Sequence, residues 1–218
     1  LLVAMGGMFS EHSGVINIAL EGMMIIGALF ACFTLQGLDQ SGFGPAHPQL
    51  SMFIAILVAG VTGIIFSLLL GFAAINLKAD QTIGGTALNL MAPALVLFLI
   101  RIIANQNTLQ MATGDSASWF MLKKSTFGVD KNVDWGFFGE TFLNKIYLAT
   151  YICILLFIIL SVILYKTKFG LRLRACGENP QAADSLGINV YKMRYAGVMI
   201  SGVLGGLGGI AFITAGVS

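Results

Sequence analysis

Charged residues are scarce in this sequence, and four long stretches have none at all. Asp, Glu, Lys and Arg together make up 10% of the 218 residues, against about 25% in a typical soluble domain. None of them occurs between positions 39 and 78, 80 and 101, 145 and 166, or 194 and 218. A transmembrane helix needs about 20 consecutive apolar residues. The sequence therefore excludes a soluble globular domain and predicts an all-α, polytopic helical membrane protein.

Other absences narrow the function. The net charge is +2 and no basic stripe is interleaved with aromatic residues, which argues against nucleic acid as a partner. No Gly-x-x-x-x-Gly-Lys-Ser/Thr motif is present, so the chain has no P-loop for ATP. The three cysteines, Cys32, Cys153 and Cys176, lack metal-ligand spacing, and we expect them to be small buried apolar side chains. With no catalytic set in sight either, we expect no enzyme and no cofactor of its own.

The apolar stretches predict about five to six membrane segments. Residues 1–9 look like the end of a helix, and residues 51–76, 82–100, 146–165 and 195–217 are long enough, or nearly so, to span. The uncharged run 23–35 is too short to span alone, so its helix should begin near Asn17 or Glu21, after Gly14. One segment is thus expected to be discontinuous or re-entrant. Pro93 predicts a kink or a break within 82–100.

Two polar segments set the expected orientation. Residues 104–144 form the longer one, and residues 166–194 contain six Lys and Arg residues. Because short cytoplasmic loops are enriched in Lys and Arg, we expect 166–194 to be cytoplasmic and 104–144 to be an extracytoplasmic loop. The chain begins and ends in apolar sequence, so we expect residues 1–218 to be a single transmembrane domain truncated at both ends.

Polar side chains within apolar surroundings are the candidate pathway residues. Glu21 has two interpretations. It faces a cavity at membrane depth, since a carboxylate near the bilayer centre costs about 2.5–3.5 kcal/mol, or it lies at the interface near a helix N-terminus, where the helix dipole favours it. Asn17, together with Gly14, is compatible with a broken helix. Asn89 either joins helices by hydrogen bonds or lines the pathway.

The last apolar stretch is rich in glycine. Gly202 and Gly206 are four positions apart, as are Gly205 and Gly209. Such pairs let helix backbones approach closely in lipid, where apolar area alone gives no net attraction between helices. They predict helix packing, either within the subunit or at a sliding or dimer surface.

A short helix is predicted inside the basic segment 166–194. Asn179 can cap its start, with Pro180 at the first helical position, and Gly187 can end it. Such a helix either lies on the cytoplasmic membrane surface without a partner or serves as a lever for an external protein.

Residues 10–24 read SEHSGVINIALEGMM, and residues 80–90 read DQTIGGTALNL. Together with the stretch from Phe169 to Ile188, they occur in the order found in the permease subunits of ABC importers for nucleosides and simple sugars. The sequence resembles this family, which is related to the ribose and branched-chain amino acid permeases, over nearly its whole length. The stretch from Asn17 to Gly22 favours the nucleoside branch, because sugar permeases of this type tend to have an Asp-Leu-Ser motif there.

The resemblance implies a transport subunit of an ATP-driven importer of a nucleoside or simple sugar in a bacterial cytoplasmic membrane. Its implied partners are cytoplasmic ATPase subunits that bind ATP and Mg, a second permease subunit (identical or different), an extracytoplasmic substrate-binding protein and the lipid bilayer. Asn17, Glu21 and Asn89 would line or frame the pathway. The residues that would transmit ATPase movement are Glu178, Asn179, Pro180, Ala183, Asp184 and Gly187. The alternative is an ion-coupled secondary transporter or channel that uses Glu21.

Overall fold

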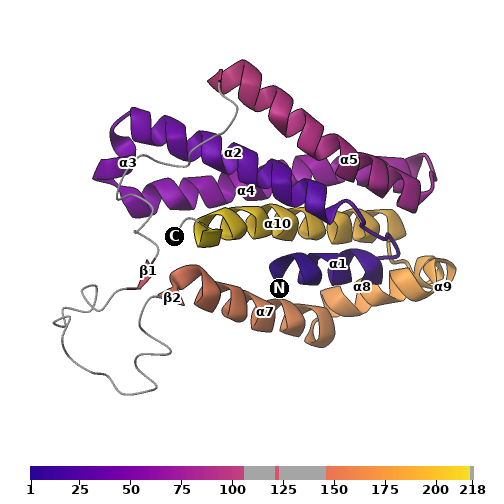
Figure 1. Cartoon of the computed structure of the whole chain (residues 1–218). Coiled ribbons are helices and arrows are strands. Elements are labelled where there is room, and N and C mark those ends of the chain that lie inside the picture. The colour runs from indigo at the N-terminus through magenta and orange to yellow at the C-terminus, as the bar shows by residue number, and fades with distance from the viewer. Residues whose placement is uncertain (106–120, 123–145, 217–218) are drawn as a thin grey trace.

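Long helices make up most of the computed structural model, which describes residues 1–105, 121–122 and 146–216 (Figure 1). The α-helices are α1 (Leu2–His12), α2 (Leu20–Gln40), α3 (Phe43–Ala46), α4 (Pro48–Gly71), α5 (Gln81–Leu99), α7 (Leu148–Lys166), α8 (Lys168–Glu178), α9 (Pro180–Ser185) and α10 (Val190–Gly216). Two π-helical turns, η1 (Phe72–Asn76) and η2 (Ile100–Ala104), follow α4 and α5. A two-residue pair, β1 (Met121–Leu122) with β2 (Ile146–Tyr147), is antiparallel.

Four helical segments are long and apolar enough to cross a membrane: Leu20–Gln40, Leu50–Asn76, Gln81–Ala104 and Val190–Thr214. A fifth is possible if α7 and α8, which are bent by 67° at Thr167, count as one broken span. The predicted polytopic, all-α membrane protein is confirmed. The α-helix α5 runs unbroken through Pro93, so a break does not occur there. The predicted loop 104–144 lies outside the described residues except at positions 104–105 and 121–122.

Helix α10 lies in the middle of the bundle and packs against α1, α2 and α4 (Figure 1). Its four predicted packing glycines are all buried against other helices of this chain. Gly202 faces Gly63 and Ser67 of α4, and Gly206 faces the Ala59 carbonyl group of the same helix. On the side toward α2, Gly205 approaches Met23 and Gly209 approaches the Met24 carbonyl group. The missing side chains allow this close approach of backbones, which supplies packing energy in lipid.

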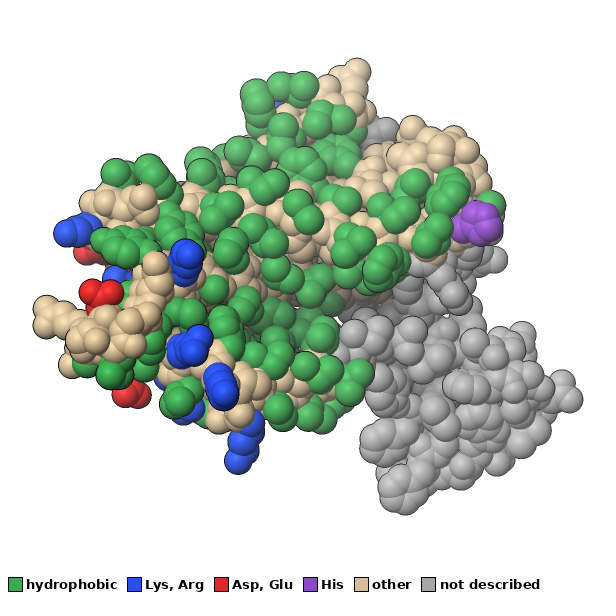
Figure 2. Space-filling view, turned by 180° about the vertical axis from the view of Figure 1, so that it is seen from behind, with side chains coloured by type: hydrophobic (Ala, Val, Ile, Leu, Met, Phe, Trp, Pro, Cys, Tyr) green, Lys and Arg blue, Asp and Glu red, His purple; other side chains and the backbone are tan. Residues whose placement is uncertain are grey.

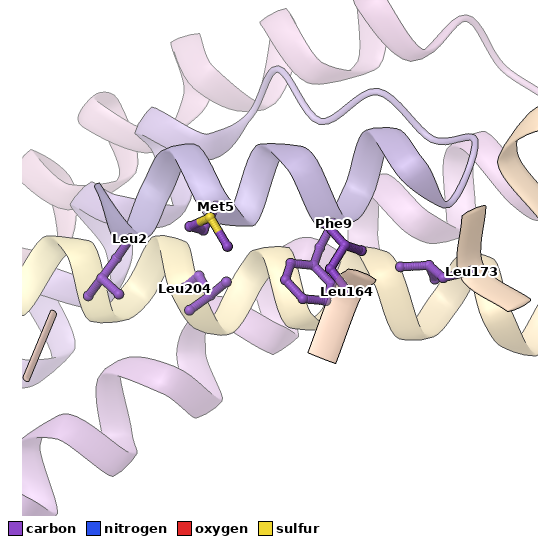
Figure 3. Packing of buried hydrophobic residues seen from close by; sticks show 6 residues of the cluster. All are labelled: Leu2, Met5, Phe9, Leu164, Leu173 and Leu204. Carbon is purple, nitrogen blue, oxygen red and sulfur yellow. The ribbon is translucent and has the colours of Figure 1, made fainter. Parts of the chain in front are cut away.

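An apolar cluster joins α1, α7 and α8 to α10 (Figure 3). Its members come from α1, α7, α8 and α10, and they are Leu2, Met5, Phe9, Leu164, Leu173 and Leu204. Because Leu173 of α8 is fully buried in this cluster, α8 is packed into the bundle. The predicted basic loop 166–194 therefore contains a second helix in addition to the short one, and α10 already begins at Val190.

Charged side chains concentrate at one end of the molecule. Figure 2 shows the Lys and Arg side chains of that face gathered at the end where α8 and α9 lie. The turn between α4 and α5, with Lys78, is at the same end, since it lines one groove together with α9. The positive-inside rule assigns such an end to the cytoplasm, and this orientation stays a prediction.

Candidate functional site: the link between α1 and α2

Residues 13–19, here called the link, connect α1 to α2 without helical structure. Helix α1 ends because Gly14 takes a left-handed conformation, with φ of +82°. Ser10 secures this end: its hydroxyl donates to the Val15 carbonyl (2.6 Å), and its own carbonyl accepts from the Ser13 hydroxyl (2.6 Å) and the Val15 N–H (3.2 Å). Ser10 and Ser13 are fully buried, so these bonds satisfy polar groups that have no access to water.

Asn17 fastens the middle of the link to α10. Its side chain is 7% exposed. The amide nitrogen donates to the Ser201 hydroxyl at 2.8 Å and lies 3.4 Å from the Met23 sulfur. The amide oxygen accepts from the Ala19 N–H at 3.0 Å, just before α2 begins. The predicted pathway residue Asn17 is therefore bonded inside the subunit.

Helix α5 holds the other side of the link. The Asn89 side chain accepts from the Gly22 N–H at 2.6 Å and donates to the Ile18 carbonyl at 3.0 Å. Gln81, at the start of α5, accepts from the Ile16 N–H at 2.7 Å. An unsatisfied backbone group costs several kcal/mol within a membrane, so irregular backbone there requires partners of this kind. Asn89 thus joins α5 to the link and to the start of α2.

Glu21 lies at about the depth of Asn89, but its side chain points away from the rest of this chain. Asn89 is nine positions beyond Asp80, the residue that caps α5, which is about 13 Å along a helix. Because Gly22 bonds directly to Asn89, the neighbouring Glu21 lies at a similar depth. Its side chain is exposed on the surface of this chain. A carboxylate at such a depth is expected to face water or protein rather than lipid.

The outer face of α5 is open. Within this chain, 6% of the most apolar 18-residue stretch of this span is buried, against 39–50% for the other three candidate spans. Figure 1 shows α5 at the edge of the bundle. Thr82 and Thr86 are exposed one turn apart on this helix, on the same face. Glu21 and the two threonines are therefore polar groups that the chain leaves uncovered, and the threonines lie nearer than Glu21 to the capped start of α5.

The short predicted helix is α9, at the charged end. The Asn179 side chain caps it by accepting from the Ala182 N–H at 3.1 Å, and Gly187 follows it with φ of +78°. Ala183 is 2% exposed and anchors the helix, whereas Glu178, Asn179, Asp184 and Gly187 are exposed and Pro180 is half-buried. Beside α9 runs a groove of roughly 700 Å³, lined also by the α4–α5 turn and by Arg194 of α10.

The structure therefore brings Asn17, Glu21 and Asn89 together around the link. The six predicted coupling residues form a separate group in and beside α9. Sequence reasoning missed Ser201 and Gln81, the hydrogen-bonding partners of the link. Both are polar residues at the edge of or within apolar stretches, and this was the signal that singled out Asn17 and Asn89. No three His, Cys, Asp or Glu side chains of the described residues come together in a way that could hold a metal ion.

Comparison with known proteins identifies this helical membrane protein as a permease component. The family described as "Branched-chain amino acid transport system / permease component" matches residues 1–218, and the chain belongs to this family. It is 45% identical to the guanosine ABC transporter permease protein NupQ of Bacillus subtilis (strain 168) over 213 residues, which are 96% of this chain and 61% of NupQ.

Two further relatives show the breadth of the family. The nucleoside ABC transporter permease protein NupC of Lactococcus lactis subsp. cremoris (strain MG1363) is 41% identical over 215 residues, 99% of this chain and 63% of NupC. The probable branched-chain amino acid transport permease protein LivH of Methanocaldococcus jannaschii is 33% identical over 163 residues, 74% of this chain and 47% of LivH. The chain thus spans about three fifths of the length of NupQ and NupC. No solved structure matches it.

Proposed function

We propose that this chain belongs to the transmembrane permease subunit of an ATP-driven importer, and that the imported solute is a nucleoside. The observation that carries the proposal is the identity of 45% and 41% to two permeases named for guanosine and nucleoside transport. A relative named for branched-chain amino acids is more distant, at 33%. The proposed location is the cytoplasmic membrane of a bacterium.

The surfaces of the chain suggest where its partners bind. Helix α9 is capped at its start and anchored by Ala183, and its other residues are exposed apart from the half-buried Pro180. Such a helix suits a lever on which a cytoplasmic ATPase docks. The open face of α5 suits a second permease subunit, because the pathway would then run between two protein surfaces. An extracytoplasmic substrate-binding protein would deliver the solute to the opposite end of the bundle.

The exposed polar groups beside the link and on α5 would serve the pathway. Glu21, Thr82 and Thr86 are exposed within this chain, and they can bond to the hydroxyl groups and base edges of a nucleoside. Asn17 and Asn89 would frame the pathway by fixing the backbone beside Glu21. Alternating access requires a difference in free energy between two states, and ATP bound to the partner would supply it.

The test is solute uptake by the complete complex in proteoliposomes. The full-length permease, its ATPase, its second permease subunit and its binding protein are assembled, and uptake of guanosine is compared with that of ribose, glucose and leucine. We expect uptake of guanosine that requires ATP. Preferential uptake of ribose, glucose or leucine would overturn the nucleoside assignment. Uptake that persists without ATP and collapses with an uncoupler would overturn the importer and favour an ion-coupled transporter.

A further inference from the structure

At Gly177 the end of α8 contacts the end of α1 and the link backbone to backbone. A Cβ atom on Gly177 would lie 2.9 Å from the His12 carbonyl carbon and 3.1 Å from the Gly14 nitrogen, and nearer still to the His12 carbonyl oxygen. Real Cβ atoms essentially never come closer than 3.0 Å to other heavy atoms. Only glycine therefore fits at position 177 while α8 stays where it is.

The contact is reciprocal. A Cβ atom on Gly14 would lie 3.2 Å from the Gly177 Cα and 3.4 Å from an Arg194 guanidinium nitrogen. Gly14 also has the positive φ that ends α1. On the side of α10, a side chain at Gly197 would collide with Ser13 of the link. Gly14 and Gly177 are called here the glycine joint.

Helix α9 and the glycine joint are mechanically connected. Asn179 is the only residue between α8 and α9, and it bonds to both: its N–H donates to the Ala175 carbonyl at 3.0 Å, and its side chain accepts from the Ala182 N–H at 3.1 Å. Leu173 and Cys176 of α8 are fully buried. A displacement of α9 would therefore be passed to the end of α8, which contacts the link at Gly177.

We infer that Gly177 is a positioning residue of the transport cycle: through the glycine joint, a displacement of α9 shifts the link and with it Asn17 and the start of α2 that carries Glu21. The inference rests on the proposed importer function. The link is suited to this role because side chains of α1, α5 and α10, rather than continuous helical hydrogen bonds, hold it in place. Such a segment can change position without breaking a helix.

The first test separates ATP hydrolysis from uptake. In the complete complex, Gly177→Ala is compared with Gly37→Ala, because no described atom lies within 4 Å of a Cβ at Gly37. We expect Gly177→Ala to retain the ATPase rate within about twofold and to lower the solute taken up per ATP by about tenfold, since the coupling energy between two sites is typically 1–3 kcal/mol. The Gly37→Ala variant should match the unmodified protein. If Gly177→Ala took up as much solute per ATP as the unmodified protein, the inference would be overturned.

A second test needs no substitution in the joint and decides the matter if Gly177→Ala fails to assemble. Cys176 is fully buried beside Gly177, so its thiol reports whether the end of α8 moves. A full-length permease with Cys176 as its single cysteine is assembled in the complex and treated with a maleimide, without nucleotide and then trapped with ATP and vanadate. We expect the labelling rate to differ between the two states by about tenfold. Equal labelling rates in the two states of a complex that transports would overturn the proposed role of the glycine joint. A complex without ATP-dependent uptake would instead overturn the proposed importer function.

Discussion

The Asn17 amide donates a 2.8 Å hydrogen bond to the Ser201 hydroxyl, across 184 positions of sequence. Both side chains are buried, and the bond fixes the non-helical link to the central helix α10. Asn89 makes the corresponding attachment from α5. Two asparagines thus hold, from opposite sides, the segment that precedes Glu21.

A double-mutant cycle on Asn17 and Ser201 should show a favourable coupling energy. Asn17→Ala, Ser201→Ala and the double variant are compared by thermal unfolding of the full-length protein in detergent. Hydrogen bonds between membrane helices average about 0.6 kcal/mol and reach ~1.7 kcal/mol in such cycles, and the burial of this pair favours the upper part of that range. Asn17→Ala combined with Ser161→Ala on α7 is the control and should be additive. Additivity in the first cycle would show that the bond contributes nothing.

Asn89→Asp should destabilise the protein more than Asn89→Ala. The Asn89 amide nitrogen donates to the Ile18 carbonyl at 3.0 Å, and an ionised carboxylate would instead place an oxygen against that carbonyl. Asn89→Ala loses both bonds without adding repulsion, at a cost of about 1–3 kcal/mol. Thermal unfolding in detergent measures both variants.

The control for Asn89 is Thr86→Ala on the same helix. The Thr86 hydroxyl bonds to the Thr82 and Ile83 carbonyl groups of α5 itself, so its loss should change stability by less than about 0.5 kcal/mol. If Asn89→Asp proved as stable as the unmodified protein, the attachment of the link to α5 would be refuted.

The spans could be predicted from the sequence because their cause is local: an uncharged apolar run has to be long enough to cross the hydrocarbon. Their ends could not be placed equally well. Lys192 and Arg194 lie within α10, since long basic side chains can extend from a helix end toward water, whereas charge alone suggested a start near residue 195. The bend at Thr167 has a local signal, because the Thr167 side chain caps α8 by accepting from the Gly170 N–H at 3.2 Å.

The candidate site could be predicted only in part. Asn17, Glu21 and Asn89 stood out because polar groups are costly in apolar runs. Their division into two bonded asparagines and one outward-facing carboxylate depends on which helices lie beside them. Contacts such as Gly177 with His12 join residues far apart in the chain, and no local pattern encodes them.

Glu21→Gln should impair uptake and leave the fold intact. The side chain is exposed within this chain, so its loss of charge should change the stability by less than about 0.5 kcal/mol. If the carboxylate lines the pathway, uptake should fall by about tenfold, which corresponds to 1.4 kcal/mol of lost interaction with the solute. ATP-dependent uptake and thermal unfolding are measured together, with Glu11→Gln, an exposed residue of α1, as the control. Normal uptake by Glu21→Gln would remove Glu21 from the pathway.

Gly187→Val should reduce substrate-stimulated ATP hydrolysis in the assembled complex more than Gly187→Asn. Gly187 has φ of +78°, and no described atom lies within 4 Å of its Cβ position, so the effect of a side chain is conformational rather than steric. Left-handed backbone costs most residues roughly 1–2 kcal/mol, and asparagine adopts it more readily. Gly37→Val, at an equally open position in α2, separates this effect from that of the added side chain. Equal ATPase rates for the valine and asparagine variants at Gly187 would contradict a role for the conformation that ends α9.

Gly206→Ala should destabilise the protein, and Gly60→Ala should not, although both glycines lie near the α4–α10 contact. A Cβ atom on Gly206 would collide with the Ala59 carbonyl group, whereas one on Gly60 would lie 3.7 Å from Val203, which is ordinary van der Waals contact. Overpacking of this kind costs about 1–3 kcal/mol, and replacing a glycine within a helix by alanine otherwise gains up to about 1 kcal/mol. Thermal unfolding in detergent should therefore give shifts of opposite sign, downward for Gly206→Ala and zero or upward for Gly60→Ala. If both variants were equally stable, the close approach of α4 and α10 through Gly206 would be wrong.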